Sequence, residues 1–444
     1  MYEFTPHGQA FAQPVTVRIP FDASKVPAGE TPRLFHAEPG GRFSEVPSAV
    51  VSGSLLEAQV HAFSYFAPGV PKLPTYEIGS EQPTHLAAYP GGSLLAVGLK
   101  NDGTGWLSLV APNGTVTWQT TFPAEVTLAL AVPRVAAGPT GNIYVVAATR
   151  KDEAGTSLGG RSEVRVTSFD SQGRERPGWP QRVTVGYDTW PAAIAADAQD
   201  RVFVYGGGSA QNMSAHDSFR PWLAAFSSSG AITAGPSAIA FSGTEPSRRI
   251  LPADMALKAG GGLYLTARVV GFGSGSDRGT GVQVTSLDVS GMPVSGFPAR
   301  LSMDTPYFGA PVALGTNDDV FVLGAQLYGL NSTGTPLQGL PANLGLGDTD
   351  ELSRDTQPRL SFGLGNLYFA GESTDRAGGA GGIDVFVQAL TSAGASLPTF
   401  PTYFGTQDDD FVAGSALDSA GRLWILWYSD GAQRKTFLTR MPGI

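Results

Sequence analysis

Between Ala87 and Trp424 the chain repeats one pattern of apolar and polar positions seven times. Each repeat has a run of small apolar residues, a Gly or Asp turn, a run of β-branched and aromatic residues, and a second turn. The first turns contain Gly92, Gly141, Asp200, Gly261, Asp318, Gly365 and Gly421. A spacing of about 50 residues is typical of stacked supersecondary units, none of which buries its own apolar face alone.

The repeat predicts four strands in each unit. Small residues open it, as in Ala192–Ala196, and suit a strand crowded around a central axis. The turn is followed by a strongly apolar strand, as in Val202–Tyr205, and then by a third strand, as in Val282–Leu287. A hairpin glycine leads into a fourth strand with an aromatic or aliphatic residue before proline. Because proline cannot donate to a sheet, we expect five prolines on the outermost strand, namely Pro123, Pro180, Pro298, Pro341 and Pro401.

Seven units of four strands predict an all-β protein whose main part, residues 73–444, is a seven-bladed β-propeller. The seventh unit has only three strands before the sequence ends at Ile444. The segment 73–79 resembles the fourth strands of other units, so we expect it to complete the last blade and close the ring, which would remove exposed sheet edges.

Residues 1–69 do not follow the repeat. Strands are predicted over Val15–Ile19, Arg33–His36, Ser48–Val51 and Glu57–Phe63, and together they indicate a small β-sandwich-like module. Residues 70–75 are predicted to form a short linker and the start of the closing strand.

Two segments resemble known families. The run from Tyr2 to Gly8, with Phe11, Pro14–Val17 and Ile19–Asp22, resembles the C-terminal half of a ZU-type (zona-occludens/UNC-five) β-domain, a module of secreted multidomain bacterial proteins. The run His61–Ala67 resembles its last strand. The missing first half implies either a fragment or a start assigned too late, and an upstream signal sequence is compatible with both. The stretch from Asp384 to Trp424 resembles SBBP-type propeller repeats, which imply a fold rather than an activity.

Composition excludes several classes of function. The formal net charge of −9 argues against nucleic acid, which requires basic surfaces. The chain contains no cysteine, which excludes disulfides and thiolate zinc sites. No apolar stretch of about 18 residues is present, so we expect no transmembrane segment.

Acidic, glycine-rich and histidine positions mostly have structural interpretations. Asp170, Asp197, Asp288 and Asp418 are interpreted as turn residues rather than calcium ligands. Gly206-Gly207-Gly208 is interpreted as a flexible loop between a second and a third strand, because no helix N-terminus follows to bind phosphate. The five histidines show no ligand spacing. The best candidate for a metal is Ca²⁺ at Asp408, Asp409 and Asp410, with a solvated charge run as the alternative.

The loops between second and third strands and between units share one face of the predicted ring, the long-loop face. Loops on a rigid scaffold are where binding residues concentrate. The candidates for a ligand-binding face are Arg150, Arg161, Asp188, Trp190, His216, Arg220, Arg249, Asp304, Tyr307, Arg354 and Asp355.

These observations favour a non-catalytic binding or scaffolding protein, exported or at the cell surface of a bacterium. We expect a monomer whose long-loop face engages a protein or a carbohydrate, and we assign no cofactor beyond the candidate Ca²⁺. The alternative is a propeller enzyme, a lyase or a glycoside hydrolase, which would need acidic or histidine residues converging near the axis. Asp188, His216, Asp304 and Asp355 are the residues for that alternative.

Overall fold

A computed structural model of the chain resolves two compact units, Met1–Pro74 with Ile444, and Thr75–Gly443. The structure describes residues 2–3, 10–22, 32–37, 44–46, 49–62, 65–69, 73–124, 132–150, 162–209, 219–239, 241, 248–271, 281–302, 310–324, 326–344, 350–351, 360–373, 382–397 and 400–441. Within these residues nearly all regular structure is antiparallel β-strand, and no helix is long and apolar enough to cross a membrane.

The first unit contains two sheets. One has the strand order β1 (Tyr2–Glu3), β7 (Tyr65–Gly69), β3 (Arg33–Ala37) and β4 (Ser44–Glu45), and the other the order β2 (Ala10–Pro20), β6 (Leu55–Ala62) and β5 (Val50–Ser52). Ile19, Leu34, Leu56 and Phe66 are buried together between them. The run 61–67, predicted as one strand, is divided between β6 and β7, because these two strands belong to different sheets.

The second unit contains, within the described residues, seven sheets that we number in chain order. Sheet 1 has β9 (Gln82–Ala88), β10 (Leu94–Leu99), β11 (Gly105–Val110) and β12 (Val116–Phe122), and sheet 2 has β13 (Arg134–Ala137), β14 (Ile143–Arg150), β15 (Ser162–Phe169) and β16 (Gln181–Val183). Sheet 3 has β17 (Asp188–Ala196), β18 (Val202–Ser209), β19 (Phe219–Phe226) and β20 (Ile232–Ala238). Sheet 4 has β21 (Arg248–Leu257), β22 (Leu263–Gly271), β23 (Gly281–Leu287) and β24 (Ala299–Ser302). Sheet 5 has β25 (Val312–Leu314), β26 (Val320–Leu323), β27 (Gln326–Leu330) and β28 (Ala342–Asn343).

Sheets 6 and 7 depart from this plan. In sheet 6 two short strands, β29 (Asp350–Glu351) and β30 (Leu360–Gly363), pair with the same edge of β31 (Asn366–Ser373), which is followed by β32 (Asp384–Thr391) and β33 (Thr402–Phe404). Sheet 7 consists of β34 (Asp410–Leu417), β35 (Leu423–Ser429), β36 (Lys435–Arg440) and β8 (Thr75–Gly79), the segment predicted to close the ring.

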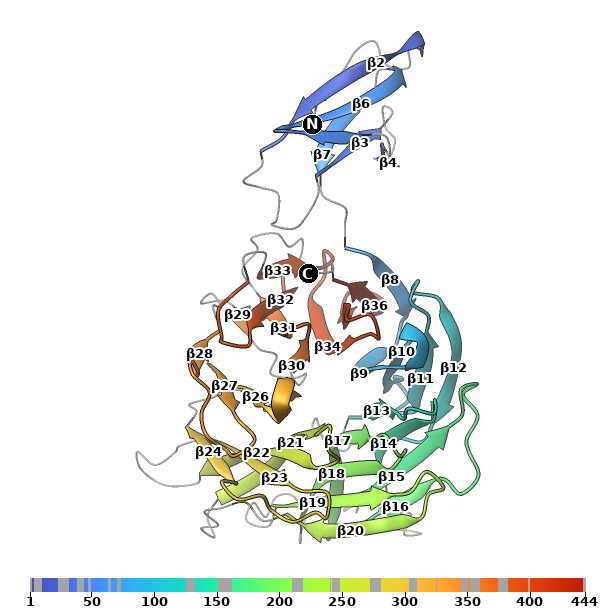
Figure 1. Cartoon of the computed structure of the whole chain (residues 1–444). Coiled ribbons are helices and arrows are strands. Elements are labelled where there is room, and N and C mark those ends of the chain that lie inside the picture. The colour runs from blue at the N-terminus through green and yellow to red at the C-terminus, as the bar shows by residue number, and fades with distance from the viewer. Residues whose placement is uncertain are drawn as a thin grey trace. The chain divides into compact units, whose positions relative to one another are not determined.

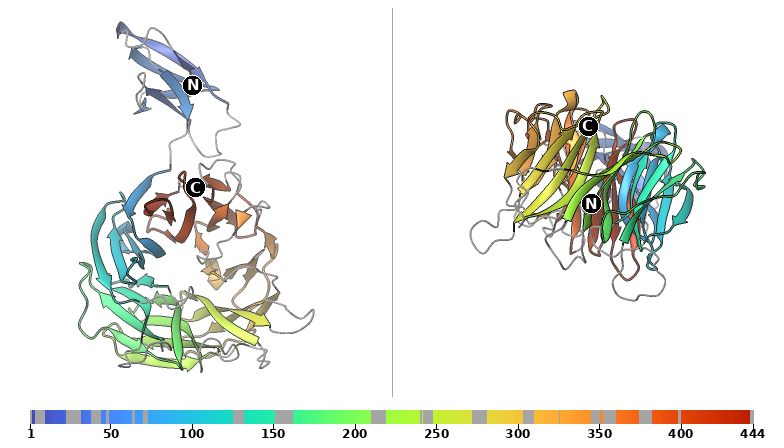
Figure 2. Two further views of the ribbon diagram at one scale, coloured as in Figure 1. Left: turned by 180° about the vertical axis from the view of Figure 1, so that it is seen from behind. Right: turned by 90° about the horizontal axis from the view of Figure 1, so that it is seen from below.

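The first strands of the seven sheets lie innermost and contact one another in cyclic order, β9, β13, β17, β21, β25, β30, β34 and again β9. Figure 1 shows the sheets arranged around this inner set, and the right-hand view of Figure 2 shows them standing side by side. This all-β arrangement of four-stranded antiparallel sheets is consistent with a β-propeller.

The hydrophobic core lies between neighbouring sheets. Leu95, Val97 and Leu107 of sheet 1 pack on Val135, Ile143 and Val145 of sheet 2. All six residues of β10 are buried, so this strand presents apolar side chains to both of its neighbours. Two-sided burial explains why the second strand of each repeat reads as a continuous apolar run instead of an alternating one.

The predicted turns adopt the expected backbone. Each of the seven residues given for the first turn has a positive φ, including the two non-glycine residues Asp200 (φ 59) and Asp318 (φ 59). The proline prediction needs a correction. Four of the five prolines, Pro180, Pro298, Pro341 and Pro401, stand one residue before the outermost strand, and Pro123 stands one residue after it, so that the missing N–H disturbs no ladder.

Candidate functional site

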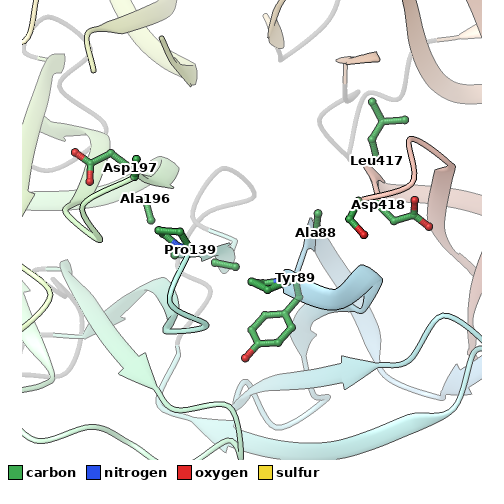
Figure 3. Close-up of a pocket in the computed structure, with 12 residues that line it drawn as sticks. Ala88, Tyr89, Pro139, Ala196, Asp197, Leu417 and Asp418 are labelled. Carbon is green, nitrogen blue, oxygen red and sulfur yellow. The ribbon is translucent and has the colours of Figure 1, made fainter. Parts of the chain in front are cut away.

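A wide-open cavity of about 420 Å³ lies at one end of the inner strands in the described part of the second unit (Figure 3). Its walls are the turns that follow β9, β13, β17 and β34, which belong to four sheets that are neighbours in the ring. The lining residues are Ala88, Tyr89, Pro90, Ala137, Gly138, Pro139, Ala196, Asp197, Ala198, Leu417, Asp418 and Ser419.

Small and apolar side chains form most of this wall. Alanine closes β9, β13 and β17 at Ala88, Ala137 and Ala196. Because a methyl group occupies little volume, the inner strands can approach one another while a space remains at their ends. The cavity thus follows directly from the small-residue runs of the repeat.

The two carboxylates of the wall are engaged by their own turns. Asp197 accepts hydrogen bonds from Gln199 N (2.9 Å) and Arg201 N (2.8 Å), and Asp418 accepts them from Ala420 N (2.9 Å) and Arg422 N (3.0 Å). Figure 3 shows both side chains turned away from the space between the turns. Asp170 and Asp288 make the same backbone bonds in other hairpins, which agrees with the turn interpretation.

Tyr89 supplies the aromatic ring of the cavity. Its hydroxyl donates to the carbonyl oxygen of Gly141 in the next sheet at 3.0 Å. Burial raises the pKa of this hydroxyl, and the charge of Asp170 raises it further. The ring is therefore held in place as a neutral hydrogen-bonded surface.

Deeper along the inner strands lies a set of three ionisable residues that the sequence reasoning missed: His85 in β9, Arg134 in β13 and Asp254 in β21. Each stands four residues before the residue that opens its turn, namely Tyr89, Gly138 and Lys258. They therefore share one level of the ring. The sequence signal for this set is a charged or imidazole side chain four residues before the turn, within a strand of otherwise small and apolar residues.

The charges of this set depend on one another. Burial lowers the pKa of Arg134 to about 10, and the negative charge of Asp254 opposes that shift. Burial raises the pKa of Asp254 to about 6, and Arg134 opposes it in turn. Burial, followed by the charge of Arg134, lowers the pKa of His85 to about 3. At neutral pH we therefore expect an Arg134–Asp254 charge pair beside a neutral imidazole.

The polar groups of the inner strands tie neighbouring sheets together. Nδ1 of His85 accepts a hydrogen bond from Val135 N (3.4 Å), which places the imidazole proton on Nε2. Asp254 accepts hydrogen bonds from Met255 N (2.9 Å) and Val312 N (3.1 Å). Glu372 in β31 accepts one from Val412 N (3.0 Å) in the next sheet. These groups act as structural acceptors between sheets.

Most of the predicted ligand-binding residues cannot be placed. Arg161, His216, Asp304, Tyr307, Arg354 and Asp355 lie outside the described residues. The backbones of Arg150 and Arg249 lie in β14 and β21, and Arg220 is exposed in β19.

Asp188 and Trp190 require a correction, because they lie in β17 and not in a loop. Asp188 is buried, and its Oδ1 accepts a hydrogen bond from Ser162 N (3.4 Å) in sheet 2. The Trp190 ring is 1% exposed and packs edge-on against Phe219 with centroids 5.2 Å apart. Neither side chain is presented to a ligand, since both fill the contact between sheets 2 and 3.

The three glycines Gly206-Gly207-Gly208 also differ from the prediction, because they lie within β18 and are buried. A Cβ on Gly207 would collide with the Trp190 indole, and a Cβ on Gly206 with the Trp222 indole. The glycines provide room for two large rings. The prediction of a flexible loop at these glycines is therefore wrong, because they form part of a buried strand.

The three aspartates predicted to bind a metal together, Asp408, Asp409 and Asp410, are held separately, because each carboxylate accepts a hydrogen bond from a different residue. Asp409 Oδ1 accepts from Ile383 N (3.1 Å), Asp408 Oδ2 from Ser429 Oγ (3.4 Å), and Asp410 Oδ2 from Thr406 N (2.6 Å). Among the described residues, no group of three or more His, Cys, Asp or Glu side chains could hold a metal ion.

Comparison with known proteins gives no family. No family model matches the chain, and no curated protein matches it. Similar solved structures include the polysaccharide lyase Uly1 (14% identity, 82% of this chain and 91% of that one, TM-score 0.48) and a protein of unknown function from Dyadobacter fermentans (13%, 70% and 94%, 0.44). Another is the GH93 α-L-arabinofuranosidase of Fusarium graminearum (11%, 67% and 92%, 0.39). At these levels of similarity none of the three indicates what this chain does.

Proposed function

We propose that the chain is a non-catalytic binding protein, built on a seven-bladed β-propeller, that receives part of its ligand in the cavity lined by Ala88, Ala137, Ala196 and Leu417. The observation that carries the proposal is the combination of an open, mostly apolar cavity with carboxylates already engaged in their turns. Ligand sites are typically concave and mostly apolar, with a few polar groups that fix orientation.

The ligand class in this proposal is a protein or a carbohydrate. A chain of net charge −9 offers little attraction to nucleic acid. The Tyr89 ring and the apolar wall of the cavity suit the apolar faces of sugars or of short peptides. We further propose an exported or cell-surface monomer, whose first unit is of the ZU type and whose repeats are of the SBBP type.

The long-loop face stays a prediction. It would lie at the opposite end of the sheets from the cavity, because the cavity is formed by the short turns between first and second strands. Of its candidates, Arg220 is the one whose side chain is described as exposed.

The enzymatic alternative receives no support from Asp188, the one described residue among its four candidates, because that carboxylate is buried and accepts a hydrogen bond from Ser162 N. A general acid or base must reach the substrate. We therefore do not propose a lyase or a hydrolase.

The test uses two matched substitutions. Ala198 and Ala259 are both exposed and stand directly after the residue that opens the turn of their sheet, but only Ala198 lines the cavity. Wild-type protein is first screened against immobilised oligosaccharides and peptides. We expect Ala198→Trp to weaken binding of the best ligand at least about tenfold, and Ala259→Trp to leave it within about twofold. Equal effects of both variants, or release of product from the ligand, would contradict the proposal.

A further inference from the structure

Asp384, which opens β32 in sheet 6, and Asp410, which opens β34 in sheet 7, share one small space beside Gly405. A Cβ on Gly405 would collide both with Oδ1 of Asp384 and with Oδ2 of Asp410. The two oxygens therefore lie within about 5 Å of each other, close enough for strong like-charge repulsion. Both side chains are almost fully buried, with exposed fractions of 1% and 0%.

The two carboxylates differ in how their oxygens are satisfied. Asp410 accepts hydrogen bonds from Thr406 N (2.6 Å) and from Thr406 Oγ1 (3.0 Å). For Asp384, neither carboxylate oxygen has a hydrogen-bond partner within the described part of the chain. A buried carboxylate without a partner is costly unless a proton or a cation neutralises it.

The chain contains an internal comparison for this arrangement. Asp188 opens the inner strand of sheet 3 as Asp410 opens that of sheet 7, and each pairs with a serine, Ser209 or Ser429, on the second strand. The position corresponding to Asp384 is Ser162, the first residue of β15.

Both the N–H and the hydroxyl of Ser162 have hydrogen-bond partners in sheet 3. Its N–H donates to Asp188 Oδ1 at 3.4 Å, and its hydroxyl donates to Thr189 O at 3.1 Å. A serine is therefore sufficient for the contact between two sheets. The second carboxylate at Asp384 is not a requirement of the fold.

We propose that Asp384 and Asp410 together bind a calcium ion beside Gly405. Besides the two carboxylates, hydroxyl oxygens lie near this position, since Thr406 Oγ1 contacts Asp410 Oδ1 at 3.0 Å and the hydroxyls of Thr406 and Ser429 lie 2.9 Å apart. Calcium is bound by carboxylate, hydroxyl, carbonyl and water oxygens in flexible geometries. Of the three residues that the sequence singled out, only Asp410 belongs to this site.

The electrostatics of the two carboxylates also favour a bound cation. The pKa of Asp410 is raised to about 6, first by burial and then also by the charge of Asp384, against the hydrogen bonds from Thr406. A divalent cation between the two carboxylates would remove both the repulsion and the unpaired buried charge.

The test measures calcium directly on the full chain. Wild-type protein is dialysed against chelator, then against buffered CaCl₂, and its metal content and melting temperature are determined. We expect about one calcium per chain and a calcium-dependent rise in Tm of at least about 2 °C. Asp384→Ser, which copies the Ser162 arrangement, should lose both, and Asp409→Asn should keep both.

The outcomes separate the cation from a shared proton. Wild-type protein without bound calcium, or with calcium content unchanged in Asp384→Ser, would overturn the proposal. If Asp384→Ser does not fold, Asp384→Asn replaces it, since this variant conserves shape and removes the charge. A Tm shift produced by Mg²⁺ but not by Ca²⁺ would also overturn the assignment of the ion.

Discussion

Oδ2 of Asp254 in β21 accepts a hydrogen bond of 3.1 Å from the backbone N–H of Val312, so one carboxylate joins the innermost strands of sheets 4 and 5. The same carboxylate is electrostatically coupled to Arg134 in β13. Such groups connect sheets that otherwise touch through apolar side chains alone, and they make the stability of the ring sensitive to pH.

We predict that the contribution of Asp254 to stability decreases between about pH 4 and pH 7, whereas the lowered pKa of His85 raises stability with pH equally in the wild type and in Asp254→Asn. The pKa of Asp254 is about 6 in the folded chain and about 3.9 when unfolded. Between these values the folded state binds more protons, so the stabilisation is complete below about pH 4 and is lost as the pH rises through 6. Relative to Asp254→Asn, the wild type should lose roughly 2 to 3 kcal/mol of unfolding free energy over this range.

Urea unfolding of both proteins at several pH values measures this difference. Arg134 stays charged and His85 stays neutral over the whole range, because their pKa values are about 10 and about 3. The substitution itself therefore adds a constant offset only. A wild-type minus variant difference that does not change with pH would contradict the assigned pKa.

A second prediction concerns the packing of Trp190. Gly207→Ala should destabilise the chain by about 1 to 3 kcal/mol, because the added methyl would collide with the indole ring of Trp190. Gly260 has no atom near its Cβ position and no positive φ, so Gly260→Ala serves as the control and should change stability by less than about 0.5 kcal/mol. Thermal unfolding provides the comparison. Equal stability of the two variants would return Trp190 to the set of candidate ligand-binding residues.

A third prediction separates turn aspartates from calcium ligands. Asp418 holds its hairpin through Ala420 N and Arg422 N, and it also accepts from the buried Trp424 Nε1 at 2.9 Å. Asp418→Ala should cost about 2 kcal/mol or more, since the indole N–H would lose its acceptor. The exposed Asp288 makes only the turn contacts, and Asp288→Ala should cost less. Neither variant should change the calcium content, and a loss of calcium in either would contradict the turn assignment.

The repeat, its turns and its strands were largely predictable, because they are local properties. Because a residue with a positive φ is usually Gly, Asp or Asn, the turns at Asp200 and Asp318 can be predicted from the sequence. A strand buried on both faces, such as β10, also has a distinctive apolar composition.

The site was less predictable, because it depends on contacts between distant residues. The sequence of Gly206–Gly208 alone indicates a loop, and only the structure shows that the Trp190 and Trp222 rings pack against these glycines. The set of His85, Arg134 and Asp254 becomes visible only when the inner strands are aligned on their turns. Asp384 and Asp410 are 26 positions apart, and nothing local indicates that their carboxylates meet beside Gly405.

The ring closes where β8, at the start of the second unit, completes sheet 7 at the end of that unit. Thr75 lies opposite Thr439 in this pairing, and their Oγ1 atoms are 2.9 Å apart. The chain has no cysteine, so a Thr75→Cys/Thr439→Cys variant contains a single pair of thiols.

Titration of free thiols after mild oxidation, with intact-mass analysis, tests the closure most directly. Paired β-strand positions bring Cα atoms within the distance that a disulfide requires. We predict near-complete loss of both thiols in the monomeric double variant, and retention of both in the control Thr75→Cys/Ser290→Cys, whose second residue lies in a turn of sheet 4. Two free thiols in Thr75→Cys/Thr439→Cys would show that β8 and β36 do not pair, and this result would contradict the closed ring.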